Sequence, residues 1–419
     1  MAPRSPKDSL AQQAEQTLAS LPSRYLGCGE DQEATFQLIM GDIGRRWEVQ
    51  VSRARCVVRP TPTRRADVVI GTDVRTWLDL RAGRTSSVQA VTDRKLYARG
   101  NLDLAIAFEG MFRLPEDRPP RVRLHDVRIE GGARIRTITA GSGDRRVILL
   151  HGLGSSKVSF IETIAHLEPH YRVHAIDLPG FGSSSKDRAP HDAPYFARSV
   201  GRFMDTLAID QAHLVGNSMG GRVALEVALS TPGRVSSLGL LCPAVAFIRN
   251  REFAPLVKLL RPELAAIPHP MLESVVRRQL LSLFARPERL DPAMADIATD
   301  EFLRVYRSRS ARVAFASAAR QIYLDPPQGR DGLWTRLAGL ERPALFVWGS
   351  HDTLIPAGFA RHVERVLPHA RQVTFDDCGH VPQIEHPRQT NGLLHSFMSR
   401  VDTEARRGHE PVQRLRRVA

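Results

Sequence analysis

The spacing of apolar and polar positions divides the chain into two parts. In the first part, alternating positions predict strands at residues 34–40, 46–51, 54–59, 66–70 and 95–99. Helical spacing predicts helices at residues 9–21, 73–81 and 101–112, with Thr72 or Asp73 capping the second and Asn101 the third. This order predicts a small α/β domain.

Beyond residue 124 the pattern changes to short apolar strands that alternate with helices. The predicted strands are residues 127–130, 133–139, 147–150, 171–176, 212–215, 235–241, 344–349 and 372–375. Strands that are apolar throughout are typical of a parallel sheet covered by helices on both faces. Between residues 243 and 342 the alternation stops, and helices are predicted at 253–260, 271–284 and 301–323 with prolines between them. This segment is expected to be a helical insertion.

The boundary between the two parts lies at a proline-rich segment. Pro119 and Pro120 resist both helix and central strand, so residues 117–123 are predicted to be a linker. We expect one domain at residues 1–116, a second at 124–402, and a basic, disordered tail at 403–419. Few contacts are expected across the linker, and the first domain is expected to fold alone.

Composition excludes several classes of protein. The chain of 419 residues carries a formal net charge of +14, but its basic residues are scattered among acids without interleaved aromatics, which argues against nucleic-acid binding. Transient contact with an anionic membrane surface stays open, as does the oligomeric state. The N-terminus has no apolar signal segment, and the longest apolar run, residues 238–248, is too short to cross a bilayer. A cytoplasmic protein is expected.

The cysteines and glycines indicate neither a metal nor a nucleotide cofactor. Cys28, Cys56, Cys242 and Cys378 lie far apart without a C-x-x-C spacing, so neither a zinc site nor a disulfide framework is predicted. The glycine pair in residues 180–182 lacks the spacing of a dinucleotide-binding loop.

The strongest chemical signal is Gly216-Asn217-Ser218-Met219-Gly220, between a predicted strand and a predicted helix. A G-x-S-x-G sequence in this context sets the serine on a sharp turn above the sheet. A serine hydroxyl needs a base, and the base needs an acid that orients it. Asp352 and His380 follow later strands in the required order, which makes Ser218, Asp352 and His380 the candidate catalytic residues.

Other residues compete for these roles less well. His351 precedes the acid, and Asp376 and Asp377 are expected to shape the turn before His380. The end of the strand at 235–241 is an alternative position for the acid, but this chain has Cys242 and no carboxylate there.

The second part resembles the α/β-hydrolase superfamily. The resemblance rests on His151-Gly152 after one strand, Asp177-Leu178-Pro179-Gly180-Phe181-Gly182-Ser183 after the next, the serine motif, Gly349-Ser350-His351-Asp352 and Gly379-His380. It implies an oxyanion hole formed by the backbone N–H groups of Leu153 and Met219, and a cap at residues 243–342 that covers the site. Phe284, Phe302, Phe315 and Tyr323 either roof an apolar cavity or pack the cap onto the core.

The first part resembles the sterol-carrier-protein-2 family, whose small α/β module holds lipids in an apolar tunnel. The resemblance rests on the apolar strand at residues 66–70 before a helix, and on the strand, glycine and polar cap in residues 96–102. Arg84-Thr85-Ser86-Ser87 departs from the family pattern. A tunnel and a solid core both remain open for this domain.

These features together predict a serine hydrolase with a lipid-binding N-terminal domain. The expected substrate is an apolar carboxylic ester, cleaved through an acyl-enzyme. One alternative is a carbon–carbon bond hydrolase of the meta-cleavage type. A second, from another class, is a lipid-binding or transfer protein whose hydrolase domain is a non-catalytic scaffold.

Overall fold

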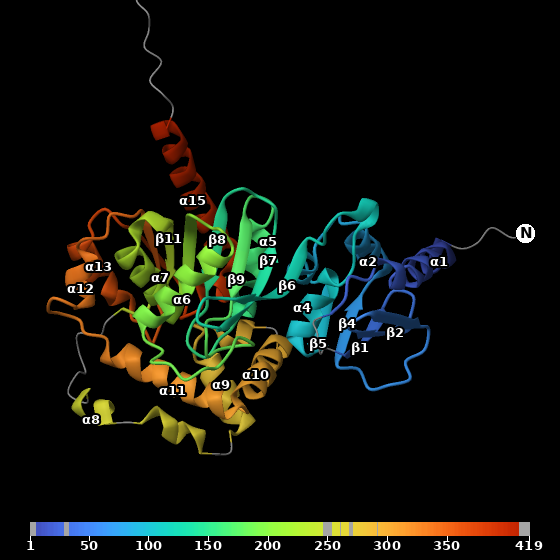
Figure 1. The fold of residues 1–419 in the computed structure, drawn as a ribbon, viewed down its shortest axis with the longest axis horizontal. Coiled ribbons are helices and arrows are strands. Elements are labelled where there is room, and N and C mark those ends of the chain that lie inside the picture. Colours follow the sequence, from blue (N-terminus) through green and yellow to red (C-terminus); the bar gives the residue numbers. More distant parts are fainter. Residues whose placement is uncertain are drawn as a thin grey trace, which may run out of the picture.

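Two β-sheets, each with its own helices, make up the molecule (Figure 1). The computed structural model describes residues 6–28, 33–245, 254–259, 261–267, 271–290 and 292–409. The smaller sheet has the strand order β3-β2-β1-β4-β5, and the larger has the order β13-β12-β11-β10-β8-β9-β7-β6. Helix α4 and strand β6 lie where the two parts meet (Figure 1).

The N-terminal sheet contains the predicted strands, each shifted by at most two residues. Its strands are β1 (Ala34–Met40), β2 (Arg45–Ser52), β3 (Arg55–Arg59), β4 (Val68–Thr72) and β5 (Leu96–Gly100). Its helices are α1 (Pro6–Ala19), α2 (Val74–Arg81), α3 (Ser87–Thr92) and α4 (Leu102–Gly110). Asp73 and Asn101 cap α2 and α4 through their side chains, as expected. Helix α3 was not predicted; the Ser86 side chain accepts a hydrogen bond at its first turn.

The large sheet is antiparallel at one edge and parallel elsewhere. Its strands are β6 (Val122–Arg128), β7 (Arg134–Ala140), β8 (Arg146–Leu150), β9 (Arg172–Ile176), β10 (Ala212–Asn217), β11 (Val235–Leu241), β12 (Ala344–Gly349) and β13 (Arg371–Phe375). The pairs β6–β7 and β7–β9 are antiparallel, and the five pairs from β9 to β13 are parallel. Strands β10 and β12 are buried at every position, which agrees with the unbroken apolar pattern.

Helices pack on both faces of this sheet and over one end of it. The sheet-covering helices include α5 (Ile161–Leu167), α6 (Ala193–Thr206), α7 (Met219–Ser230), α13 (Ala360–Val366) and α15 (Pro387–His409). The segment predicted as the cap contains α8 (Ala254–Leu259), α9 (Glu273–Leu281), α10 (Pro292–Tyr306), α11 (Arg309–Leu324) and α12 (Leu333–Leu337). Figure 1 shows α8 to α11 beneath the sheet, whereas α12 lies beside the sheet next to α13. Among the described residues, no helix is long and apolar enough to cross a membrane.

Several boundaries differ from the prediction by more than two residues, among them the start of β6 at Val122 and the end of α9 at Leu281. The helix expected at 301–323 is two helices, α10 and α11. The extended backbone of Ser308 interrupts the helix between Tyr306 and Arg309. Pro292 was expected to break a helix and instead begins α10, a position that proline tolerates. Residues 403–409 belong to α15 rather than to a disordered tail, and the rest of the predicted tail, 410–419, lies outside the described residues. Residues 253 and 260, the two ends of the predicted helix at 253–260, also lie outside them.

The expectation of few contacts across the linker is wrong. Strand β6 already begins at Val122, inside the predicted linker, and its N–H donates to Glu109 Oε1 of helix α4 at 3.2 Å. The Ser86 hydroxyl donates to Glu168 Oε1 at 2.6 Å, and Val88 packs into the apolar core beside helix α5. The two parts therefore share a buried, partly polar interface.

Glu168 makes this interface sensitive to pH. Burial raises the pKa of its carboxyl to about 6, against the opposing hydrogen bond from Ser86 and the charge of Arg121. Between the usual pKa of 4.5 and about 6, the folded state binds more protons than the unfolded state, so stability falls as pH rises through that window.

Replacing Glu168 by Gln removes this ionisation. As the pH rises from 4.5 to 7.5, the unchanged protein should lose about 2 kcal/mol of unfolding free energy that Glu168→Gln does not lose. The variant should therefore gain stability relative to the unchanged protein over this pH range. Urea unfolding at the two pH values measures it, with Glu364→Gln on the exposed side of α13 as the control. A difference that does not change with pH would contradict the assignment.

Candidate functional site

Ser218 lies on a strained turn between β10 and α7. Its backbone φ angle is +52°, a value that residues other than glycine rarely adopt. A Cβ atom on Gly216 would lie 2.3 Å from the backbone of Gly220, and one on Gly220 would lie 2.0 Å from the carbonyl oxygen of Leu150. Both glycines are therefore required for the close approach of strand, turn and helix, as the sequence predicts.

Asp352 and His380 form a buried pair at the ends of β12 and β13. His380 Nδ1 lies 2.7 Å from Asp352 Oδ2, and both residues are buried. Asp352 Oδ1 accepts the backbone N–H groups of Leu354 and Ile355, both at 2.9 Å. The carboxylate is thus fixed from both sides, and a hydrogen bond from Nδ1 leaves Nε2 of His380 as the nitrogen that can accept a proton.

The backbone of His380 is attached to the serine turn and to the cap. The Asn217 side chain, next to Ser218, donates from Nδ2 to the carbonyl oxygens of His380 and Leu241, each at 3.0 Å. The His380 N–H donates to the carbonyl oxygen of Leu283 in the cap at 2.7 Å. The three candidate residues, far apart in the chain, are thereby brought to one end of the sheet.

The predicted oxyanion loop follows β8 and lies against the serine. A Cβ atom on Gly152 would lie 3.3 Å from Cβ of Ser218, so the loop passes in contact with the turn. His151 shapes this loop: Nδ1 lies 2.8 Å from the Gly152 carbonyl, and Nε2 accepts the Leu178 N–H at 3.0 Å. Burial lowers the pKa of His151, which keeps it neutral. Leu153 follows in this loop, and Met219 begins α7.

The competing residues have other partners. Asp377 forms ion pairs with Arg286 at 3.0 Å and Arg289 at 3.3 Å. Desolvation alone would raise the pKa of its carboxyl, but the hydrogen bond from Arg286 and the charges of both arginines together outweigh this and lower the pKa. His351 Nδ1 lies 2.9 Å from the hydroxyl of Ser350. Asp352 is thus the carboxylate bonded to His380.

Cys242 lies beside this pair, at the alternative position for the acid, where this chain has no carboxylate. Its Sγ and ligand atoms of Asp352 and His380 all lie within 4.8 Å of one another, a group that could hold a metal ion. Both oxygens of Asp352, however, already accept hydrogen bonds, and burial raises the pKa of the Cys242 thiol well above its usual value. A protonated thiol is a poor metal ligand, so these residues fit a hydrogen-bonded pair better than a metal site.

Part of the predicted aromatic roof lies over the oxyanion loop. A Cβ atom on Gly154 would lie 3.0 Å from the ring of Phe315 and 3.3 Å from that of Phe302. These rings pack with Tyr306 between α10 and α11. Phe284 and Tyr323 are half-buried. The cap therefore covers the loop with apolar rings.

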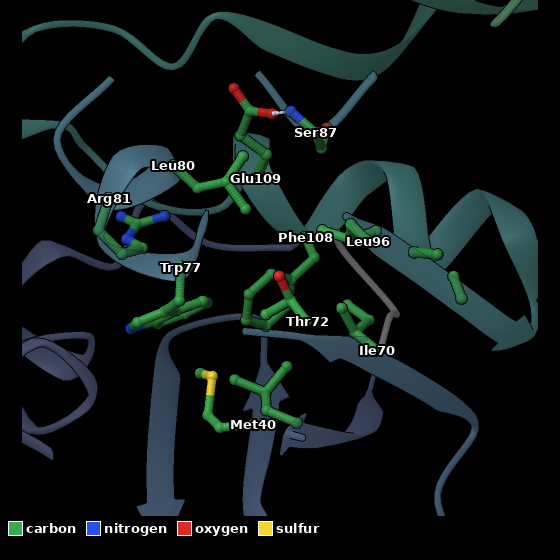
Figure 2. A pocket seen from close by; sticks show the side chains of 13 residues that line it. Met40, Ile70, Thr72, Trp77, Leu80, Arg81, Ser87, Leu96, Phe108 and Glu109 are labelled. Atoms are coloured by element: carbon green, nitrogen blue, oxygen red, sulfur yellow. Dashed lines mark hydrogen bonds between the residues drawn. The ribbon is translucent and has the colours of Figure 1, made fainter. Parts of the chain in front are cut away.

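A second candidate site is an apolar cavity of about 40 Å³ in the N-terminal domain (Figure 2). Met40, Ile70, Trp77 and Phe108 lie around it, and Phe108 also packs on Phe36 with ring centroids 4.8 Å apart. This volume holds only a few water molecules. The domain is thus a nearly solid core, and an acyl chain could enter only by displacing side chains.

The cavity also has a polar end. Arg81 and Glu109 line it and are both buried, and Figure 2 shows Glu109 bonded to the backbone N–H of Ser87, at 2.6 Å. Burial lowers the pKa of Arg81 to about 10, which still leaves it charged at neutral pH. The end of the cavity therefore places a guanidinium and a carboxyl beside an apolar wall.

A strained serine turn, a loop after β8 that contacts it, and a histidine–aspartate pair lie at one end of a mostly parallel sheet, which is the arrangement of an α/β-hydrolase-fold enzyme. Residues 145–387 match the family model of the alpha/beta hydrolase fold, and the chain belongs to that family. Residues 30–113 match the model of the SCP-2 sterol transfer family, so the resemblance of the N-terminal domain is confirmed.

Relatives within the hydrolase family have different substrates in their names. A 2-hydroxy-6-oxononadienedioate/2-hydroxy-6-oxononatrienedioate hydrolase of Paraburkholderia phymatum is 31% identical, over 64% of this chain and 93% of its own. A pimeloyl-[acyl-carrier protein] methyl ester esterase of Xanthomonas campestris is 30% identical, over 60% and 94%. The structure of a membrane phospholipase A, a bacterial virulence factor, is 25% identical, with a TM-score of 0.56 over 78% and 97%.

Sequence reasoning missed two residues at this site. Asn217 stands inside the serine motif, but its bond to His380 joins positions 163 residues apart and needs the fold to be seen. Lys157 follows the oxyanion loop and is completely buried. The chain has only five lysines against many arginines, and a lysine directly after that loop was a usable signal.

The close packing of the turn at Ser218 can be tested with one added methyl group. Gly220→Ala would force Cβ against Leu150 and His151, at 2.0 and 2.8 Å, so we expect a loss of about 2–4 kcal/mol in unfolding free energy. Gly201→Ala on α6 has nothing within 4 Å and should stabilise the protein by about 0.5–1 kcal/mol. Urea unfolding of both variants checks this; equal effects would contradict the steric argument.

Proposed function

We propose that the protein is a serine hydrolase that cleaves carboxylic esters with an apolar chain. Ser218 Oγ attacks the ester carbonyl carbon while His380 Nε2 takes its proton, and Asp352 holds the imidazole through Nδ1. The proton then passes to the departing alcohol, which leaves an acyl group on Ser218. Water, deprotonated by His380, attacks this acyl-enzyme and releases the carboxylic acid. The observation that carries this proposal is the buried 2.7 Å bond between His380 and Asp352, with the His380 carbonyl bonded to Asn217, the neighbour of the strained Ser218.

Leu153 and Met219 supply the oxyanion hole in this proposal. Their backbone N–H groups would donate to the carbonyl oxygen as it gains negative charge. Met219 is the first residue of α7, where the helix dipole favours an anion, and the Gly152 contact with Ser218 keeps Leu153 close to the reacting serine.

An apolar ester is favoured by the cap and by two of the similar proteins. Phe302 and Phe315 cover the oxyanion loop with aromatic surface, which suits an alkyl chain. The relatives named as a methyl ester esterase and as a phospholipase A act on esters by name. The relative named as an oxononadienedioate hydrolase favours a second candidate, hydrolysis of a carbon–carbon bond in a dienone acid. Turnover of such an acid, with no turnover of esters, would favour the second.

We propose that the N-terminal domain binds an apolar chain for the hydrolase domain. Its cavity has apolar walls and a polar end at Arg81 and Glu109, which suits an alkyl chain with a polar head. A bound chain would raise the local concentration of substrate.

The four cysteines, all in the described part of the chain, form no disulfide, which supports the proposed cytoplasmic location.

The nucleophile can be tested by covalent labelling. A fluorophosphonate probe should label Ser218, and Ser218→Ala should lose both labelling and hydrolysis of p-nitrophenyl esters. The variant should keep its near-ultraviolet circular dichroism, because the hydroxyl is not needed for the turn. Labelling that persists in Ser218→Ala would exclude this nucleophile.

The acid is tested by a comparison of two carboxylates. Asp352→Asn should lower kcat by roughly 10²–10⁴-fold, because an amide neither selects the correct tautomer nor stabilises the imidazolium. Asp377→Asn, the matched control, should leave kcat within about twofold, because Asp377 pairs with arginines of the cap. Steady-state kinetics on a short ester measures both, and the opposite ranking would mean that the acid is misassigned.

Ligand binding by the N-terminal domain is tested by filling its cavity. A charge introduced at Phe108 would not test binding alone, because Phe108 packs on Phe36 and Phe112 in the core and its replacement would destabilise the domain. Ala105→Phe instead adds a ring to the cavity lining and should weaken binding of a fluorescent fatty acid by the full-length protein at least tenfold.

Val91→Phe, which adds the same ring at an exposed position of α3, is the control for this substitution. Fluorescence titration measures both affinities. Equal affinities in the two variants would place the fatty acid outside the cavity.

A further inference from the structure

Lys157 is a buried cation at the end of the oxyanion loop. Its side chain is 1% exposed. Its backbone N–H donates to Asp177 Oδ1 at 2.8 Å, and its ammonium Nζ lies 2.8 Å from Asp177 Oδ2. One carboxylate therefore holds Lys157 at both ends and fixes the point at which the loop, residues 151–156, joins the rest of the domain.

A second carboxylate reaches Lys157 from the N-terminal domain. Asp103 Oδ1, in the first turn of α4, lies 2.8 Å from Nζ of Lys157, and Asp103 is also buried. Arg136 on β7 lies 3.8 Å from Asp103 Oδ2 and balances the additional negative charge. A buried ammonium is tolerated only where partners replace its lost hydration, and the N-terminal domain provides one of these partners.

The loop is held at its other end by the same segment. His151 accepts the N–H of Leu178, the residue after Asp177, and Gly152 contacts Ser218. Residues 177–178 thus anchor both ends of the loop that carries the Leu153 N–H. A shift of the Lys157 ammonium would be transmitted through Asp177 and the loop backbone to that N–H.

We propose that Asp103 is a positioning residue for the hydrolase site, acting through Lys157 to hold the oxyanion loop. The N-terminal domain is then a structural part of the catalytic unit as well as a carrier attached to it. Helix α4 contributes Asp103 to this contact and Ala105, Phe108 and Glu109 to the apolar cavity, so one helix borders both sites. The inference rests on the proposed serine hydrolase function.

The experiment removes the carboxylate in the full-length protein. Asp103→Ala should lower kcat for p-nitrophenyl butyrate about tenfold and leave KM within twofold, because a displaced loop weakens oxyanion binding without altering ester binding. The inhibition constant of an alkyl trifluoromethyl ketone, whose adduct with the serine carries the oxyanion, should rise about tenfold. Asp103→Asn keeps an acceptor near Lys157 and should recover most of both losses.

Asp126→Ala is the matched control, because Asp126 also pairs with Arg136, at 3.2 Å, without touching Lys157. It should leave kcat and the inhibition constant unchanged. Labelling with a fluorophosphonate probe counts the folded active sites, so that a loss of fold is not taken for a loss of rate.

A folded Asp103→Ala with the kcat and inhibition constant of the unchanged protein would overturn the proposal and leave Asp103 as an interface residue only. If Asp103→Ala does not fold, Asp103→Asn decides: an inhibition constant raised about threefold supports the proposal, and an unchanged one overturns it. Esterase activity that survives Ser218→Ala would instead refute the proposed function, whatever the Asp103 variants do.

Discussion

The hydrogen bond between His380 Nδ1 and Asp352 Oδ2 is the contact on which the proposed chemistry depends. A serine hydroxyl is a weak nucleophile, and only an imidazole with the correct nitrogen unprotonated can activate it. The protein fixes this imidazole by burying both partners and by giving Asp352 two further N–H donors. Asn217 and Leu283 then hold the His380 backbone from the serine turn and from the cap.

The same end of the sheet depends on the N-terminal domain. Proline-rich segments often separate independent modules, but here β6 begins at Val122, directly after Pro119-Pro120 and Arg121. Apolar contacts at Val88 and Ile106 are joined by polar ones at Ser86 and Asp103. Such an interface argues against two freely moving domains, because separation would expose buried charges to a new environment and break their hydrogen bonds.

Local patterns predicted the elements that depend on local causes. The strands, the caps at Asp73 and Asn101, and the glycine turn at Ser218 follow from side-chain periodicity and backbone sterics. The order of Ser218, Asp352 and His380 was predictable because the fold imposes it.

What the sequence could not provide are contacts between distant segments. The rarity and position of Lys157 marked it in the sequence, but only the packing of α4 shows that it is buried between Asp103 and Asp177. The size of the N-terminal cavity likewise depends on how Phe108 packs against Phe36. Helix α3 was missed because six residues contain too little periodicity to distinguish a helix from a loop.

The central claim, an acyl-enzyme on Ser218, is tested most directly by rapid mixing with a p-nitrophenyl ester followed by acid quench and peptide mass analysis. The account predicts a burst of nitrophenol that approaches one equivalent per active site, and an acyl group on the peptide that contains Ser218. Steady hydrolysis with neither a burst nor an acylated peptide, under conditions in which deacylation limits the rate, would contradict it.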